Sequence, residues 1–303
     1  MRLPDWVKAQ PPAIGGPAIG GLGAGVLELK KFLRKSGIHT VCEEARCPNK
    51  AACFSRSGAA FLIMGPVCTR NCGFCSVRSA MDSGGTGPVG SGPSGLGPLS
   101  GDEPERLAAA ARAMGLRYVV ITSVTRDDLE DGGAGHFADC IRAVKSGIPG
   151  ARVEVLTPDF GGSRTALETV LSAGPDVFNH NVETVPGLYP AVRPQADYKR
   201  SLSVLGWASE SGIPVKSGFM LGLGEKTEEV AAVMRDLRAG GCRMLTIGQY
   251  LRPSRRSLPV SEYVRPERFV ELKTAALAMG FRSVASGPLV RSSMNAEEYY
   301  RDV

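Results

Sequence analysis

The sequence predicts an α/β fold, a partial (β/α)6 barrel of the TIM type. From residue 59 onward, short apolar stretches that are typical of buried strands alternate with longer stretches in which apolar residues recur at helical spacing. Six such units follow one another, each of about thirty residues. Eight units would close a full barrel, so six predict an open one with a side entrance for a bulky substrate. The chain has 303 residues and is 43% hydrophobic, which is enough for a large core.

The chain before the barrel is predicted to be an extension, residues 1–58. Residues 10–25 are mostly Gly, Ala and Pro with a few Ile and Leu, a composition that holds a helix poorly, so we expect a flexible lead-in. Residues 26–34 have helical spacing and end at Ser36-Gly37. The cysteine-bearing stretch 42–53 is broken by Pro48-Asn49, which predicts a loop with short helical pieces.

Strands and helices are then expected in strict alternation over the barrel, residues 59–286. The expected strands are 60–64, 118–124, 152–156, 176–180, 214–220 and 244–248, with a last apolar piece at 281–285. The expected helices are 104–114, 135–146, 164–173, 198–211, 227–239 and 266–279. The first of these has Asp102 as its expected N-cap, Pro104 in its first turn and Gly115 as its stop. Short right-handed crossovers make such a series a parallel sheet.

Residues 83–101 form an insertion that consists almost wholly of Gly, Ser and Pro. Such a composition buries too little apolar surface to offset the entropy of ordering the chain, so a mobile loop is expected. Residues 287–303 follow the barrel as a C-terminal tail.

The composition excludes several classes of function. The net charge is +6, but the basic residues are scattered among 30 acidic ones, which indicates an acidic partner at most. No basic stripe interleaved with aromatic residues is visible, so no nucleic-acid partner is expected. No apolar run approaches the roughly 18 residues of a membrane span. The first ten residues lack the pattern of a targeting segment, and we therefore expect a cytoplasmic protein.

Six of the eight cysteines fall into two groups of three, which organise the sequence. The first trio is Cys42, Cys47 and Cys53; the second trio is Cys68, Cys72 and Cys75. Closed zinc sites and disulfide frameworks both use cysteines in even numbers. Two groups of three instead suggest two iron–sulfur clusters, each short of one protein thiolate.

The second trio has the spacing C-x3-C-x2-C with Phe74 before its last cysteine, and it follows the carboxyl end of the first expected strand. Three thiolates on a tight loop can hold three irons of a [4Fe–4S] cube and leave the fourth iron open. This motif resembles the signature of the radical S-adenosylmethionine (SAM) superfamily. In that superfamily the open iron binds the amino and carboxylate groups of SAM, and reduction yields a 5′-deoxyadenosyl radical. Zinc is the weaker alternative because none of the three histidines, His39, His136 and His180, has ligand spacing to this trio.

The first trio, within VCEEARCPNKAAC, resembles the auxiliary-cluster motif of lipoyl synthases, and further blocks resemble the same family. These blocks are TSVTRDDLEDGGAGHF (122–137), FNHNVETVPGLYPAVRPQADYKRSL (178–202), KSGFMLGLGEKTEE (216–229), LTIGQYLRPS (245–254) and GPLVRSSM (287–294). The resemblance covers nearly everything from residue 40 to the C-terminus except the 83–101 insertion. Two cluster motifs in order, together with these collinear blocks, make it specific.

The resemblance implies insertion of two sulfur atoms, at C6 and C8 of an octanoyl chain that is amide-linked to a lysine of a lipoyl carrier domain. Those carbons carry no acidic proton, so a radical is required rather than acid–base catalysis. The implied cofactors are two [4Fe–4S] clusters and SAM, with the sulfur coming from the auxiliary cluster held by the first trio. The implied partners are the E2 subunit of a 2-oxoacid dehydrogenase or the H protein of glycine cleavage, an electron donor such as ferredoxin or flavodoxin, and an iron–sulfur carrier that rebuilds the cluster.

The resemblance also assigns individual residues. The three cysteines of the second trio and Ser293 are the implied catalytic residues. Ser293, within Arg291-Ser292-Ser293-Met294, is the implied fourth ligand of the auxiliary cluster, with Ser292 as the alternative. The expected SAM contacts, which are polar groups at strand ends, are Asn181, Glu183, Thr122, Lys216 and Arg193. Arg193 would meet a carboxylate or be solvated, and Gly222–Gly224 would be either a platform for adenine or a turn.

Some residues are expected to have no chemical role. Cys140 and Cys242 are expected to be small buried side chains. The acidic group of Asp127, Asp128 and Asp131 suggests a cation site or, more in keeping with the family, loop capping near SAM. The chain departs from the family at Met294, where Tyr is usual, and at Ala52, where Glu commonly precedes the third cysteine; neither position is a cluster ligand. The alternatives to a lipoyl synthase are another sulfur-inserting radical SAM enzyme and a non-catalytic iron–sulfur protein.

Overall fold

The computed structural model describes residues 3–8, 26–55, 58–82 and 96–300. The chain divides into two compact units. The β2 unit comprises residues 11–71 and 76–176, and the β8 unit comprises residues 1–10, 72–75 and 177–303. The expected lead-in (10–25) and most of the expected insertion (83–95) lie outside the described residues.

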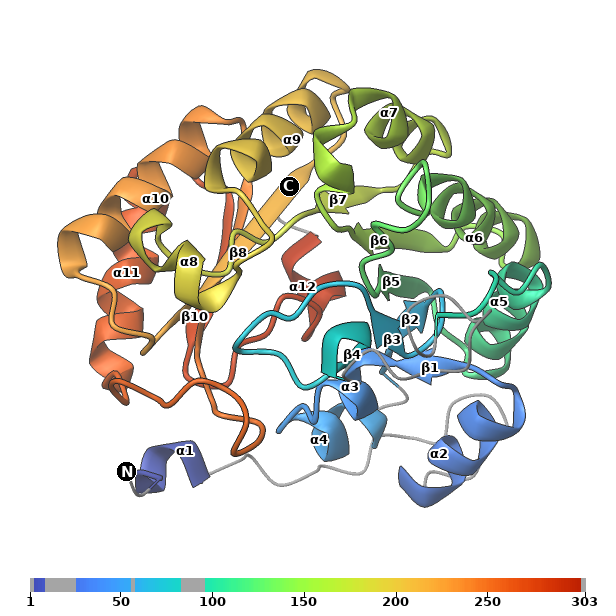
Figure 1. Ribbon diagram of the computed structural model, residues 1–303, viewed down its shortest axis with the longest axis horizontal. Helices are drawn as coiled ribbons and strands as arrows, with labels where there is room; N and C mark the ends of the chain where they lie inside the picture. Colours follow the sequence, from blue (N-terminus) through green and yellow to red (C-terminus); the bar gives the residue numbers. More distant parts are fainter. Residues whose placement is uncertain (1–2, 9–25, 56–57, 83–95, 301–303) are drawn as a thin grey trace. The chain divides into compact units, whose positions relative to one another are not determined.

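The β2 unit contains a sheet with the strand order β1-β2-β5-β6 (Figure 1). Its strands are β1 (His39–Thr40), β2 (Ala60–Ile63), β5 (Tyr118–Ser123) and β6 (Arg152–Leu156). Strands β2, β5 and β6 run parallel to one another, and the short β1 pairs with β2 in the antiparallel direction. The same unit holds a two-stranded parallel ribbon of β3 (Val67–Cys68) and β4 (Arg78–Ser79).

Helices pack against this sheet through their apolar sides. They are α2 (Val26–Lys35), α3 (Val41–Glu44), α4 (Lys50–Phe54), α5 (Glu103–Ala113), α6 (Ala134–Gly147) and α7 (Arg164–Ser172), with 3-10 turns η1 (Ala80–Asp82) and η2 (Phe160–Gly162). Leu107 of α5, Phe137 and Ile141 of α6, and Leu167 of α7 are fully buried. All four residues of β2 are buried as well, as expected for a parallel strand covered on both faces.

The β8 unit contains four parallel strands in the order β7-β8-β9-β10. They are β7 (Val177–Asn179), β8 (Val215–Leu221), β9 (Met244–Gln249) and β10 (Ser283–Gly287). Its helices are α1 (Asp5–Lys8), α8 (Tyr189–Val192), α9 (Tyr198–Glu210), α10 (Thr227–Ala239), α11 (Pro266–Ala278) and α12 (Ala296–Tyr300), with the 3-10 turn η3 (Pro186–Leu188). Every residue of β9 is buried, so this strand lies in the core of the unit.

The structure confirms the predicted α/β fold of parallel strands joined by helices. Each of the six expected strand–helix units is present, and the last apolar piece, 281–285, contributes to a further parallel strand, β10. The expected short helical pieces around the first trio are α3 and α4. Strand β1 was not predicted, because two residues give no measurable alternation. Asp102 is the N-cap residue of α5, as expected, although its carboxylate makes no capping bond and instead accepts hydrogen bonds from Ser100 and Arg106.

No helix in the described ranges is both long enough and apolar enough to span a membrane.

Candidate active site

The first trio lies on two short helices and the turn between them, all in the β2 unit. Cys42 is in α3, whose N-terminus is capped by the Thr40 hydroxyl accepting from the Glu43 amide at 3.3 Å. The Cys47 amide donates to the Cys42 carbonyl at 3.1 Å, which turns the chain back after α3. Cys53 is in α4. None of the eight cysteines forms a disulfide, so all three thiols are in the reduced form that metal binding requires.

The three thiols of the first trio are close enough to influence one another. Burial, together with the like charges of Cys47 and Cys53, raises the pKa of Cys42 to about 12. Loss of the thiol protons therefore requires a positive charge at this site, which a bound metal cluster supplies. Among the described residues, no three or more His, Cys, Asp or Glu side chains converge on a single ion position. Thiolates on a [4Fe–4S] cube each bind a different iron, so three neighbouring thiols fit three positions of such a cluster.

The histidines do not serve either trio. Each one is hydrogen-bonded to a side chain that is not a cysteine. The pairs are His39 with Glu44 at 3.2 Å, His136 with Glu103 at 2.6 Å, and His180 with Ser201 at 3.0 Å.

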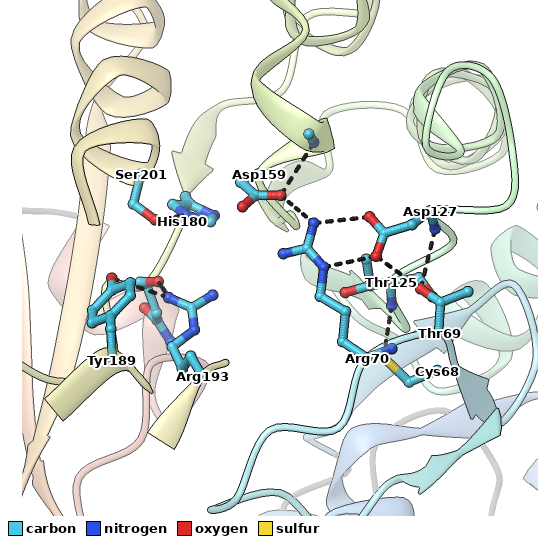
Figure 2. Close-up of polar contacts among 12 residues, drawn as sticks. Cys68, Thr69, Arg70, Thr125, Asp127, Asp159, His180, Tyr189, Arg193 and Ser201 are labelled. Carbon is cyan, nitrogen blue, oxygen red and sulfur yellow. Dashed lines mark hydrogen bonds and ion pairs between the residues drawn. The ribbon is translucent and has the colours of Figure 1, made fainter. Parts of the chain in front are cut away.

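Cys68 of the second trio ends β3 in the β2 unit. Its sulfur accepts hydrogen bonds from the backbone amides of Arg70 at 3.4 Å and Thr125 at 3.3 Å (Figure 2). Such N–H···S bonds stabilise the negative charge on a cluster thiolate and tune its reduction potential. The surroundings of Cys68 thus fit a cluster ligand.

Cys72 and Cys75 of the second trio lie in the β8 unit, where the segment between them is a tight turn. The Cys75 amide donates to the Cys72 carbonyl at 3.0 Å. Gly73 is bonded on both sides, donating to the Val192 carbonyl at 2.9 Å and accepting from the Leu258 amide at 2.8 Å. A Cβ atom at Gly73 would lie 2.9 Å from the Leu258 side chain, so only glycine fits. The apolar cluster that contacts this segment through Phe74 contains Val192, Leu223, Tyr250, Leu258 and Val260.

An ion-pair cluster around the buried Arg70 fixes the loop of the second trio, and sequence reasoning missed it. Figure 2 shows the Arg70 guanidinium held between Asp127 and Asp159. Its Nε and Nη2 donate to the two carboxylate oxygens of Asp127, both at 2.8 Å, and Nη2 also donates to Asp159 at 2.6 Å. Burial opposes the charge, but the hydrogen bonds to the two carboxylates outweigh it and raise the pKa of Arg70. The available signal was a charged residue between two cluster cysteines, together with Asp159 just beyond a buried strand.

Asn181 and Glu183 follow the carboxyl end of β7, as expected for SAM contacts. The Asn181 amide donates to the Glu183 carboxylate at 3.1 Å, and its Oδ1 is buried without a hydrogen-bond partner among the described residues. Glu183 has a φ of 64°, a costly conformation for a residue with a side chain. Burial raises the pKa of Glu183, opposed by the nearby charges of Arg193 and Arg291 and by the Asn181 hydrogen bond. Asn181 thus offers a buried acceptor beside Glu183, whose backbone is strained. Both features fit a site that binds a polar ligand.

Arg193 is buried, which excludes the alternative of a solvated arginine. Its Nη1 donates to the carbonyls of Asn181 at 3.0 Å and Val182 at 3.3 Å, and its guanidinium lies 5.5 Å from the centre of the Tyr189 ring. Arg193 therefore holds the backbone from which Asn181 and Glu183 project.

The tail serines pack beside this group within the β8 unit. Asn181 Nδ2 donates to the Ser292 hydroxyl at 3.3 Å, and the buried Lys216 Nζ donates to the Ser292 carbonyl at 2.6 Å. A Cβ atom at Gly248 would come within 2.3 Å of the Val290 carbonyl, so the tail lies directly on β9. In the part of the chain that the structure describes, Ser293 makes no hydrogen bond through its hydroxyl. Lys216, expected to contact SAM, thus holds the serine turn in this structure.

Thr122 and the Gly222–Gly224 turn have partners inside the protein. The Thr122 hydroxyl, in the β2 unit, donates to the Leu156 carbonyl at 2.9 Å. In the β8 unit, the Glu225 carboxylate accepts from the amides of Gly222 at 2.6 Å and Leu223 at 2.9 Å. Gly222 and Gly224 have φ values of 96° and 112°, so these glycines are needed for the turn itself.

The three members of the acidic group have different partners. Asp131 accepts from the amides of Gly133 at 2.8 Å and Gly135 at 2.7 Å and so caps the start of α6, as expected. Asp127 and Asp128 instead form ion pairs with Arg70 and Arg126. Cys140 and Cys242 are fully buried, and burial raises the pKa of both thiols.

Comparison with known proteins decides the family. The model of the radical SAM superfamily matches residues 62–237, more than half of the chain. A lipoyl synthase from Rubrobacter xylanophilus is 51% identical over 301 residues, covering 99% of this chain and 87% of that protein. A lipoyl synthase from Caldanaerobacter subterraneus is 49% identical over 299 residues, covering 98% of this chain and 96% of that protein.

The chain belongs to the lipoyl synthase family. As a lipoyl synthase family member with a radical SAM domain, it is a radical SAM enzyme that inserts sulfur, and its cofactors include a [4Fe–4S] cluster and SAM. The resemblance read from the two cysteine trios is confirmed, and a non-catalytic iron–sulfur protein is excluded.

Solved structures place this lipoyl synthase family member in the radical SAM fold. Methylornithine synthase matches with a TM-score of 0.53 at 17% identity, covering 89% of this chain and 77% of that one. The hydrogenase maturase HydG matches with a TM-score of 0.54 at 17% identity, covering 86% of this chain and 55% of that one. At this identity the likeness concerns the fold alone, and it confirms the predicted radical SAM type of α/β fold.

Proposed function

We propose that the protein inserts two sulfur atoms, at C6 and C8 of an octanoyl chain attached to a lysine of a lipoyl carrier domain, and that an auxiliary [4Fe–4S] cluster donates them. The observation that carries this proposal is the presence of two separate cysteine trios in one chain. The second trio suffices for radical generation in a radical SAM enzyme. The first trio has no role in that step. Its three thiols lie close to one another and form no disulfide, so they are available to hold a second cluster that supplies the sulfur.

The residues of the second trio hold the radical-generating cluster through Cys68, Cys72 and Cys75. When bound, this cluster and SAM supply the radical that removes hydrogen from carbons no base can deprotonate. The protein's part is to position them. Backbone amides donate to the sulfur of Cys68. Asn181 and Glu183 would present a buried acceptor and a carboxylate to SAM, and Arg193 holds the backbone carbonyls of Asn181 and Val182. Thr122, near the end of β5, and Lys216, near the start of β8, complete the proposed set of SAM contacts.

Cys42, Cys47 and Cys53 hold the auxiliary cluster in this proposal, with Ser293 as the fourth ligand. Ser292 is engaged through its hydroxyl by Asn181 and through its carbonyl by Lys216. Because the Ser292 hydroxyl is already engaged, these bonds favour Ser293 over Ser292 as the fourth cluster ligand. An oxygen ligand suits an iron–sulfur cluster less well than thiolate does, so it is released more easily as the cluster is dismantled.

The partners follow from the substrate. The octanoylated carrier would be the E2 subunit of a 2-oxoacid dehydrogenase or the H protein of glycine cleavage. A ferredoxin or flavodoxin would supply electrons, and an iron–sulfur carrier would rebuild the spent auxiliary cluster. The proposed location is the cytoplasm.

The direct test is anaerobic turnover. The protein is reconstituted with iron and sulfide, then incubated with SAM, dithionite and an octanoyl-lysine peptide, and both deoxyadenosine and peptide mass are followed. We expect deoxyadenosine together with a peptide carrying two added sulfurs. Deoxyadenosine with no sulfur in the peptide would refute the substrate assignment and favour a different sulfur-inserting enzyme.

A further inference from the structure

The connection between β9 and α11, residues 250–265 of the β8 unit, is rich in arginine. It carries four arginines, Arg252, Arg255, Arg256 and Arg265, against one acidic residue, Glu262. It leaves the sheet at the carboxyl end of β9, and Asn181 and Glu183 follow the carboxyl end of β7 in the same parallel sheet. Because parallel strands end at a common edge, this basic loop belongs to the edge that carries the chemistry.

The inner side of this loop is bonded to the cysteine turn of the second trio. The Leu258 amide donates to the Gly73 carbonyl, between Cys72 and Cys75, at 2.8 Å. The side chains of Leu258 and Val260 pack into the apolar cluster that contains Phe74. The loop is therefore immediately beside the cluster-binding turn.

Internal hydrogen bonds fix the shape of the loop. Arg252 donates from Nε to the Ser257 carbonyl at 2.8 Å and from Nη2 to the Arg255 carbonyl. The hydroxyls of Ser254 and Ser257 are 3.0 Å apart, and the Arg256 amide donates to Ser254 at 3.3 Å. The Arg252 side chain thus stabilises the loop, and the loop fixes the backbone positions of Arg255 and Arg256.

Among the described residues, none bonds to the guanidinium groups of Arg255 and Arg256. Both residues are exposed, and no ion pair or side-chain hydrogen bond engages either guanidinium in the described part of the chain. Several other surface arginines do have a carboxylate partner. Examples are Arg142 with Asp139, Arg164 with Glu168, and Arg268 with Glu271. Two adjacent cations without a counter-charge, on a fixed loop beside the cluster turn, are available to an external partner.

We propose that Arg255 and Arg256 form a docking surface for acidic side chains that flank the octanoylated lysine of the carrier domain. This rests on the proposed function, because the octanoyl chain must reach the catalytic edge while its carrier remains outside. Opposite charges at the rim of an interface accelerate encounter and fix orientation, and they do so more strongly at low salt. The proposal predicts a carrier with a cluster of Asp and Glu around the modified lysine.

The test compares two substrates and two double variants. Arg255→Glu with Arg256→Glu reverses the proposed surface, whereas Arg235→Glu with Lys273→Glu makes the same charge change at exposed positions of α10 and α11. Each protein is assayed with an octanoylated carrier domain and with a short neutral octanoyl-lysine peptide. Carrier affinity is also measured by calorimetry without turnover, at low and high salt.

We expect the loop variant to bind the carrier about tenfold more weakly, with a reduced salt dependence, and to process the peptide at the wild-type rate. The helix variant should match the wild type in every assay. Unchanged carrier affinity in the loop variant would overturn the proposal, and so would equal losses with both substrates or an equal effect in the helix variant. A wild-type protein that converts neither substrate refutes the proposed function instead, while calorimetry still tests the docking surface.

Discussion

At the scale of single residues, two adjacent serines have different surroundings. Ser292 is held by Asn181 and Lys216, whereas the Ser293 hydroxyl is not engaged in the described part of the protein. The sequence alone does not separate them, because they are adjacent residues of the same type. Their difference arises from the tail packing on β9, which is a tertiary contact.

Ser293→Ala should therefore spare radical generation and impair sulfur insertion. The second trio is untouched, so deoxyadenosine formation should stay within about twofold of the wild type, while lipoyl product falls at least about tenfold, as for loss of a metal ligand. Both are measured in one anaerobic assay. Ser292→Ala is the matched control and should have the smaller effect on sulfur insertion. The reverse order of the two variants would assign the ligand to Ser292.

Other residue-level expectations from the sequence met with mixed outcomes. Arg193 is buried and holds backbone carbonyls, so its solvated alternative is wrong. Glu225 was not singled out, yet its carboxylate binds the amides of the Gly222–Gly224 turn. Both roles depend on where a side chain turns after its strand ends, which neither composition nor spacing encodes.

At the scale of secondary-structure elements, Arg70 joins three loops of the β2 unit. It lies in the loop after β3, Asp127 lies after β5, and Asp159 lies after β6. The Arg70 and Asp159 side chains are only 5% and 0% exposed, so each charge depends on its partner for solvation. Removing one partner of a buried pair leaves an uncompensated charge, which costs more than the intact pair contributes.

Asp159→Asn should accordingly loosen the loop that carries Cys68. We expect a loss of about 3 kcal/mol in the free energy of unfolding of the metal-free chain. We also expect lower iron content after reconstitution and an altered reduction potential of the SAM-binding cluster, since the amide bonds to Cys68 shift. Asp139→Asn, which removes a surface ion pair, should leave the free energy of unfolding, the iron content and the reduction potential unchanged. An unchanged potential and iron content in Asp159→Asn would limit Arg70 to a purely structural role.

The elements themselves were largely predictable. The alternation of strand and helix patterns located β6 and α10 with the bounds that the structure shows, and the other principal elements within a few residues. Among the elements that were missed, β1 and the β3–β4 ribbon have two residues per strand and are defined by their pairing partners. The short helices α1, α8 and α12 were missed as well. Asp102 shows the limit of capping rules, because a nearby arginine competed for its carboxylate.

At the scale of the whole molecule, the count of cysteines gave the most information. Two groups of three predict two open clusters, and the comparisons then established the family and one [4Fe–4S] cluster with SAM. The six cysteine ligands stay a prediction, which was possible because metal-binding cysteines follow regular spacings. The groups that support them, such as Asp159 and Lys216, lie far away in the sequence and have no spacing rule, so only the fold reveals them.

The central claim, that the first trio holds a cluster that is consumed as the sulfur source, has one direct measurement. The protein is reconstituted with heavy-isotope sulfide, freed of excess sulfide, and allowed a single turnover with SAM and an octanoyl-lysine peptide. The account predicts a lipoyl product in which both sulfurs carry the heavy isotope, and none when the three cysteines Cys42, Cys47 and Cys53 are changed to alanine. Product sulfur of natural isotopic composition, or labelled product from the alanine variant, would contradict it.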